Sequence, residues 1–244
     1  MPAAPELAQR VRAALEFERR VNLHRFPIQI TAAADRLRLQ GPVGTVAAKR
    51  LAVRIATDLA AGDGLVIEDG LHVAPATEHA DGEIADAFGA TLLASPEFRP
   101  LSVRRQRGAA QVALRAFNGE ATGEILFAVR DGAVDLAGIV PSLSHRRLAE
   151  ALAWWTPGCR NVVNQLVVAP PERDGDDELA DAVGLVLEVD PALPDAQPIG
   201  VNATFGVVTL TGSLRDEGQR QRAEFDAWCV DGVKDVRNAI AVGR

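Results

Sequence analysis

The 244-residue chain contains no tyrosine, and aromatic residues account for only 5% of it. Hydrophobic residues nevertheless make up 48% of the sequence, so a packed core must consist mainly of valine, leucine, isoleucine and alanine. A chain of this length can form one large domain or several small ones. The choice between them has to come from the internal organisation of the sequence.

Cysteine and histidine are also scarce. The two cysteines, Cys159 and Cys229, favour free buried thiols in a reducing compartment over a disulfide. The four histidines are scattered, and neither His-x3-His nor Cys-x2-Cys spacing occurs, which excludes the usual metal-binding patterns. The glycines form neither a GxGxxG motif nor a phosphate-binding loop, so we expect no metal, nucleotide or other cofactor.

The chain has no excess of basic residues and no long apolar run. Its formal net charge of -7 disfavours general nucleic-acid binding, because such binding depends on neutralising phosphates. No window approaches the roughly 18 apolar residues of a membrane span. Near the N-terminus, charges at Glu6, Arg10 and Glu16 predict an amphipathic helix instead of a signal peptide. We therefore expect a soluble, cytoplasmic protein.

The most informative feature of the sequence is a stretch that occurs twice. Leu148–Val168 reads LAEALAWWTPGCRNVVNQLVV, and Arg222–Val242, 74 positions later (222 − 148), reads RAEFDAWCVDGVKDVRNAIAV. Each copy predicts a helix that ends near a glycine, then a tight turn and a strand. The offset is constant, so the copies align without a gap; the matched pairs include Trp154 with Trp228, Gly158 with Gly232, and Asn164 with Asn238.

The segments before these copies also correspond. Acidic helix starts, DGEIADA at Asp81 and DDELADA at Asp176, lie 95 positions apart (176 − 81), and strand pairs close on Gly138 and Gly212. The two offsets differ, so the earlier copy contains an insertion of about 21 residues (95 − 74) within 101–123, which we interpret as an extra hairpin. The pattern of residues 5–73 predicts a more divergent copy of the same unit.

These patterns predict an α+β protein made of three tandem αββαβ modules, each with a small three-stranded mixed sheet packed on two helices. We place the modules at residues 5–74, 80–169 and 176–244, with the extra hairpin in the second. Both helices should cover one face of each sheet. The other face is then left to solvent, to another repeat or to a second copy of the chain in a homo-oligomer.

The repeated pattern resembles the BON domain, the bacterial osmotically inducible and nodulation module. The resemblance rests on the acidic helix start, the strand pair closing on Gly138 or Gly212, and the following Ala-Glu, Trp, Gly, Val and Asn positions. It implies a non-catalytic module, often in tandem, that is associated with phospholipid or cell-envelope binding and with stress protection. The first unit lacks the tryptophan and the asparagine of the other two.

Two groups of residues are candidates for function or for structure. A basic cluster in the insertion either docks on anionic lipid headgroups, binds an acidic face of another protomer, or is a solvated hairpin tip; it comprises Arg104, Arg105, Arg107 and Arg115. Trp155 is either an interfacial lipid anchor or a packing residue. We assign structural roles to the repeated positions Gly138, Trp154, Gly158, Asn164, Gly212, Trp228, Gly232 and Asn238.

The sequence offers no combination of nucleophile, base and orienting residue, so we expect no catalytic residues. The function that the resemblance favours is a non-catalytic binding protein that associates with phospholipid or envelope material or acts in a stress response. The alternative is a cytoplasmic interaction scaffold whose modules pack with each other or with another protein.

Overall fold

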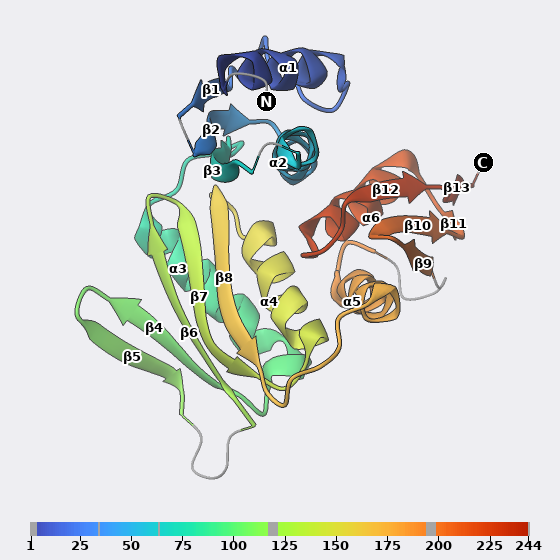
Figure 1. The fold of residues 1–244 in the computed structure, drawn as a ribbon. Coiled ribbons are helices and arrows are strands. Elements are labelled where there is room, and N and C mark those ends of the chain that lie inside the picture. The colour runs from blue at the N-terminus through green and yellow to red at the C-terminus, as the bar shows by residue number, and fades with distance from the viewer. Residues whose placement is uncertain (1–3, 34, 63, 117–121, 194–198, 244) are drawn as a thin grey trace. The chain divides into compact units, whose positions relative to one another are not determined.

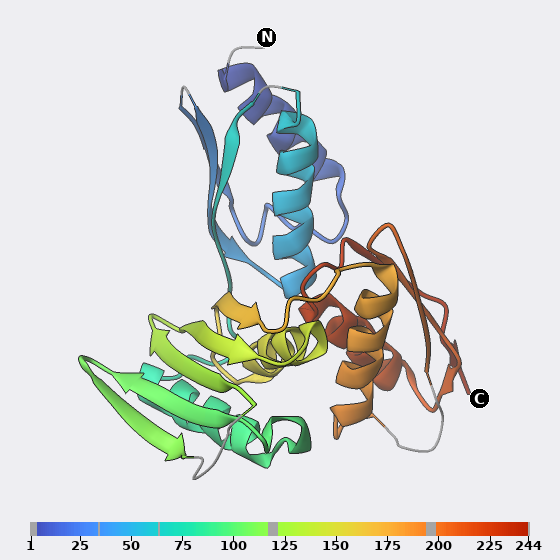
Figure 2. The same cartoon turned by 60° about the horizontal axis from the view of Figure 1, so that its bottom comes forward.

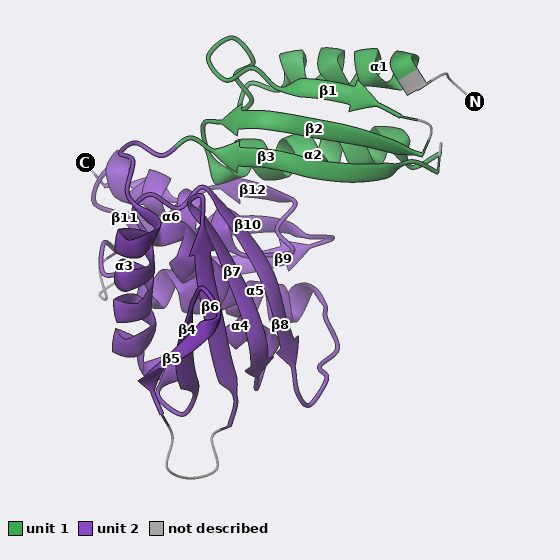
Figure 3. Ribbon diagram, turned by 90° about the vertical axis from the view of Figure 1, so that its left-hand side faces the viewer, with its two compact units in different colours: residues 1–74 green, residues 75–244 purple. Residues whose placement is uncertain are grey.

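A computed structural model of the chain describes residues 4–33, 35–62, 64–116, 122–193 and 199–243. The chain divides into two compact units, Met1–Ala74 and Pro75–Arg244 (Figure 3). The first unit contains one αββαβ repeat, and the second unit contains two. The predicted fold class is therefore confirmed, including the extra hairpin in the second repeat.

The first unit follows the predicted order of elements. It consists of α1 (Ala4–Phe17), β1 (Gln29–Ala32), β2 (Arg36–Val43), α2 (Val46–Ala60) and β3 (Val66–Val73). Strand β2 is central, antiparallel to β1 and parallel to β3. The Thr45 hydroxyl accepts a hydrogen bond from the Ala48 backbone N–H at 3.0 Å and so caps α2. Leu37 and Leu39 of β2 are buried in the core.

The second repeat has a wider sheet than the first. Its elements are α3 (Asp81–Ala94), η1 (Pro96–Phe98), β4 (Ser102–Arg107), β5 (Ala110–Arg115), β6 (Glu124–Arg130), β7 (Ala133–Val140), α4 (Leu143–Trp155) and β8 (Asn161–Val168). The strand order is β5-β4-β6-β7-β8, with β4 parallel to β6. The inserted hairpin therefore extends the module's sheet at the β6 edge, while α3 and α4 lie on one face (Figure 1).

The third repeat returns to the simple form. Its elements are α5 (Asp176–Val189), β9 (Gly200–Thr204), β10 (Val207–Thr211), β11 (Ser213–Leu214), α6 (Glu217–Cys229), β12 (Asp235–Asn238) and β13 (Ala241–Val242). Strand β10 is antiparallel to β9 and parallel to β12, and β11 pairs with β13. This is the arrangement of the first repeat, except that two short parallel pairs, β10–β12 and β11–β13, take the place of the single pair β2–β3.

The aspartates that begin α3 and α5, Asp81 and Asp176, bind the backbone of a strand turn in their own repeat. The Asp81 carboxylate accepts hydrogen bonds from the backbone N–H groups of Asp131 and Gly132, at 3.0 and 2.8 Å. The Asp176 carboxylate does the same for Phe205 and Gly206, at 2.7 and 2.9 Å. Asp81 therefore fastens α3 to the turn between β6 and β7, and Asp176 fastens α5 to the turn between β9 and β10.

In the second and third repeats, the repeated asparagines join the second helix to the strand that follows it. The Asn164 amide donates to the Arg146 carbonyl oxygen at 3.0 Å, and its Oδ1 accepts from the Leu166 N–H at 3.2 Å. The equivalent bonds of Asn238, to Arg220 and from Ile240, measure 2.8 and 3.3 Å. Both amides also donate to a glutamate of the helix, Glu150 or Glu224.

The glycine that closes each strand pair is required by the backbone. Gly138 has φ = 123° and Gly212 has φ = 124°, values that side chains other than glycine rarely adopt. A Cβ on Gly138 would also collide with the carbonyl oxygen of Glu124 on the neighbouring strand. The positive φ explains why this position is glycine in both copies, and the close approach of Glu124 is a second reason at Gly138.

The face of the second repeat's sheet that lies opposite its helices carries exposed apolar side chains. Along β7 the buried residues Val134 and Leu136 alternate with positions on the open face, where Ile139 is exposed. On β8, Val163 and Val167 are exposed in the same way. Among the described residues, no helix has the length and apolarity that crossing a membrane requires.

Candidate functional site

The second and third repeats meet through their helices. Helix α4 of the second repeat packs against α5 and α6 of the third, and α4 and α5 lie side by side in both views (Figures 1 and 2). This packing places two groups of polar residues between the repeats. One group lies along the seam, and the other borders a cavity.

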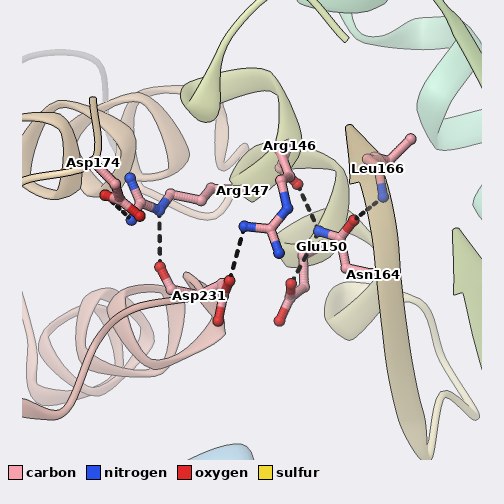
Figure 4. A network of polar contacts seen from close by, with 7 residues as sticks. All are labelled: Arg146, Arg147, Glu150, Asn164, Leu166, Asp174 and Asp231. Carbon is pink, nitrogen blue, oxygen red and sulfur yellow. Dashed lines mark hydrogen bonds and ion pairs between the residues drawn. The ribbon is translucent and has the colours of Figure 1, made fainter. Parts of the chain in front are cut away.

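The seam is centred on a buried arginine. The side chain of Arg147 on α4 is 2% exposed; its Nη2 donates to Asp174 Oδ1 at 2.8 Å, and its Nε donates to the Asp231 carbonyl oxygen at 2.9 Å (Figure 4). Arg146 Nη1 reaches the Asp231 carboxylate at 3.1 Å. One arginine therefore joins α4, the connection to α5 and the turn after α6. A Cβ on Gly232 would lie 3.0 Å from Arg147 Nη2, so glycine there makes room for it.

A cavity of about 420 Å³ lies where the ends of these helices meet. Residues of α3, α4 and α5, residues of the segments that follow these three helices, and one residue of α6 form its wall. The apolar part of the wall includes Ala87, Ala94, Leu152, Trp155, Val189 and Pro191. The charged part consists of Asp190, directly after α5, and Arg222 on α6.

Arg222 is held by aromatic and acidic partners at once. Its guanidinium carbon lies 5.1 Å from the ring centroid of Trp155 and 5.1 Å from that of Phe225, within cation–π range. Its Nε donates to Asp190 Oδ2 at 2.6 Å and lies 3.3 Å from Asp226 Oδ1. The guanidinium plane is therefore fixed at the cavity wall.

The two aspartates behind Arg222 form a buried carboxyl pair. Burial, together with a hydrogen bond to Asp190, raises the pKa of Asp226 to about 9, against the opposing charge of Arg222. Burial by itself would raise the pKa of Asp190 too, but hydrogen bonds from Asp226 and Arg222 outweigh it and lower that pKa. At neutral pH, Asp226 is thus protonated and donates to ionised Asp190. With Arg222 included, the cluster carries no net charge.

The structure gathers the four candidate arginines on the β4–β5 hairpin but gives them different surroundings. Arg105 is 10% exposed, pairs with Asp86 and donates to the Gly82 carbonyl oxygen. Arg115 donates to the carbonyl oxygens of Leu101 and Phe98, at 3.0 and 2.6 Å. Arg104 and Arg107 keep exposed side chains; Arg104 Nε lies 3.2 Å from Glu124, and Arg107 Nη2 lies 3.8 Å from Asp86.

The remaining predicted residues divide between the cores and the cavity. Trp154 and Trp228 are buried in the second and third repeats. Gly158 and Gly232 follow the preceding helix with φ values of 86° and 96°. Trp155 lies in the cavity wall, stacked with Arg222, and is not part of the arginine hairpin.

The sequence interpretation overlooked Arg222, Asp190 and Asp226. The repeat contained a signal for two of them, because the 74-residue offset aligns Arg222 with Leu148 and Asp226 with Leu152. Both leucines are buried in the second repeat. A charged pair at two positions that are apolar in the sister repeat indicates a buried polar cluster. Among the described residues, no three His, Cys, Asp or Glu side chains are grouped to hold a metal ion.

Comparison with known proteins agrees with the repeats. The BON domain matches residues 4–75, 109–170 and 175–244. The middle match omits α3, which the inserted hairpin separates from the rest of its repeat. Osmotically-inducible protein Y of Escherichia coli K12 is 32% identical in a 113-residue alignment that covers 44% of this chain and 56% of that protein. The chain thus spans just over half the length of this relative.

Two solved structures of CdsD, a structural protein of the type III secretion system of Chlamydia trachomatis, are each 14% identical to the chain. One is its C-terminal domain, with a TM-score of 0.25 over 91% of this chain and 93% of that one; the other scores 0.24 over 98% and 92%. Scores this low support no further comparison. The three BON matches cover most of the sequence, with one match in each of the three repeats, and the chain therefore belongs to the BON domain family.

Proposed function

We propose that the chain is a non-catalytic binding protein with a stress-related or envelope-associated role, and that its β4–β5 hairpin docks on an anionic phospholipid surface. Membership of the BON family and the similarity to an osmotically inducible protein support the general role. The hairpin supports the specific one, because it is the element that the second repeat adds to the common module.

The exposed side chains of the hairpin combine positive charge with apolar surface. Arg107 pairs with Ala110 and Arg105 with Val112, so Arg107 and Val112 project from the same face of the hairpin. Val112 and Leu114 are both exposed, and Arg104 projects from the opposite face. Cationic groups beside apolar side chains suit the interface of an anionic bilayer, where both attractions act together.

The internal pairing of Arg105 supports this arrangement. Its contacts with Asp86 and Gly82 fasten the hairpin to the start of α3, so the exposed arginines are presented by a fixed element. The net charge of -7 opposes approach to an anionic surface. Binding should therefore be weak and lost as salt screens the charges, over a Debye length of about 8 Å at 0.15 M ionic strength.

An interaction scaffold is the second candidate. It is favoured by the open face of the second repeat's sheet, where Ile139, Val163 and Val167 are exposed. Apolar side chains grouped on one surface are typical of protein-binding faces. In this case the chain would self-associate or bind another protein through the sheet, and the hairpin would contribute little.

Sedimentation with vesicles separates the two candidates. We expect the protein to pellet with phosphatidylglycerol-containing vesicles at low salt and not with pure phosphatidylcholine vesicles. The double variant Arg104→Ser/Arg107→Ser should pellet less. The matched control is Arg173→Ser/Arg237→Ser, which removes two exposed arginines elsewhere and changes the net charge equally.

Wild-type protein that stays in the supernatant with anionic vesicles at low salt would refute lipid docking. Equal loss of binding in the two double variants would show that net charge matters and the hairpin does not. A solution mass above that of the monomer, lowered by Val167→Lys, would support the scaffold.

A further inference from the structure

The cavity between the second and third repeats has the dimensions of a ligand site. Its volume of about 420 Å³ falls within the range of about 300–1,000 Å³ that small-molecule pockets occupy. Its wall combines α3 and α4 of one repeat with α5 and α6 of the next, so neither repeat contains the cavity alone. None of the four arginines of the hairpin lines the cavity, so a ligand site here is independent of the lipid-docking proposal.

The wall chemistry restricts what can bind. Most of the wall is apolar, with Leu152, Trp155 and Val189 among the larger side chains. Arg222 Nε donates to Asp190 Oδ2 at 2.6 Å, so the positive and negative charges of the wall compensate each other. An anionic ligand would meet the Asp190 carboxylate, and a cationic ligand would meet Arg222. A neutral ligand avoids both repulsions.

Arg222 still has donors to offer. Only its Nε is used in the hydrogen bond to Asp190, and its terminal nitrogens carry no hydrogen bond to another described residue. Stacking against Trp155 and Phe225 holds these nitrogens in place. A carbonyl or ether oxygen on a ligand could accept a hydrogen bond from them without displacing an existing partner.

We propose that this cavity binds a small, neutral, mainly apolar molecule that carries one hydrogen-bond acceptor, with Arg222 as the donor and Trp155 as part of the apolar wall. Two BON repeats fused through α4 and α5 then have a binding site that a single repeat lacks.

The fluorescent probe Prodan tests the site directly, because it is neutral, has an apolar two-ring body and carries one carbonyl oxygen. We expect saturable binding at one site, with a blue shift of Prodan emission and a change in tryptophan fluorescence. The anionic probe 1-anilinonaphthalene-8-sulfonate should bind at least about tenfold more weakly, and so should the carbonyl-free analogue 2-dimethylaminonaphthalene.

Helix α3 offers a matched pair of variants. Ala94 is exposed and lines the cavity, so Ala94→Phe should fill it and weaken Prodan binding at least about tenfold. Ala90 is exposed on the same helix outside the cavity wall, so Ala90→Phe should leave binding unchanged. Ala87→Phe, another exposed wall position, replaces Ala94→Phe if that variant does not fold as judged by circular dichroism.

Several results would overturn the site. They are Prodan binding that is unchanged in both cavity-filling variants, binding that is absent in the wild type, or tighter binding of the anionic probe. The Arg104→Ser/Arg107→Ser variant should keep full Prodan affinity, and Ala94→Phe should keep vesicle binding. Failure of either proposal therefore leaves the other measurable.

Discussion

Replacement of Asp226 by asparagine should change how the stability of the second unit depends on pH. Asp226 is fully buried, and its pKa is raised from 3.8 to about 9, first by burial and then by the hydrogen bond to Asp190. The folded protein therefore holds a proton that the unfolded chain releases above pH 3.8. It follows that the stabilisation is complete below this value and declines as pH rises toward 9.

The expected size of this effect follows from the pKa shift. Each pKa unit corresponds to about 1.4 kcal/mol, so the free energy of unfolding should fall by up to about 4 kcal/mol between pH 4 and pH 7. Asp190 has a lowered pKa, so its own contribution is lost as pH falls below 3.8, outside this range. The lowered pKa of His145, caused by burial, acts in the opposite direction below pH 6.5. It is common to both proteins and cancels in their difference.

Asparagine keeps the donor to Asp190 but has no proton to lose. We expect Asp226→Asn to match the wild type near pH 4 and to become more stable than it by up to about 4 kcal/mol at pH 7. Urea unfolding followed by tryptophan fluorescence measures this unit alone, because all three tryptophans lie in it. The control Asp181→Asn, an exposed position on α5, should keep the wild-type pH dependence. A variant whose stability declined with pH as steeply as the wild type would refute a protonated Asp226.

Three further predictions concern packing and connections. Trp228→Ala should lower the free energy of unfolding of the second unit by about 3–5 kcal/mol, because Trp228 is among the largest fully buried side chains; an unchanged urea midpoint would contradict this. Arg147→Ala should lower the free energy of unfolding of the second unit by about 1–3 kcal/mol, because it removes the hydrogen bonds to Asp174 and Asp231. The second and third repeats should then unfold in two transitions. A single transition at the wild-type urea midpoint would argue against a stabilising role of these bonds between the repeats. A nonspecific protease should cut first within residues 74–80, at the boundary of the compact units. Cuts within 169–175 should come later, because Glu172 accepts a hydrogen bond from the Leu143 N–H at 2.8 Å and Asp174 pairs with Arg147. First cuts inside 201–242 would contradict this order.

The fold was predictable because its signals are local and repeated. The constant offset between the Trp154 and Trp228 segments defined the second helix, the turn and the last strand of two repeats. The difference between the two offsets located the insertion within 101–123, and strands β4 and β5 lie there. Gly138 and Gly212 have positive φ and occupy the same place in both copies. Because such a conformation favours glycine, the requirement is visible in the sequence.

The candidate sites were less predictable because they depend on contacts between distant segments. Arg147 meets Asp174 and Asp231, which lie 27 and 84 residues further along the chain (174 − 147 and 231 − 147). Strand alternation implies that Arg104 and Arg105 point to opposite faces, but only the packing of α3 shows that Arg105 is the buried one. The cavity exists only where four helices from two repeats come together.

The proposed lipid docking is tested most directly by the salt dependence of vesicle binding. The fraction of protein bound to phosphatidylglycerol vesicles should be measured over a series of salt concentrations for the wild type, Arg104→Ser/Arg107→Ser and Arg173→Ser/Arg237→Ser. Docking through the hairpin predicts that the first double variant binds less and depends less steeply on salt, while the second resembles the wild type. Identical salt curves for all three proteins would contradict docking through the hairpin.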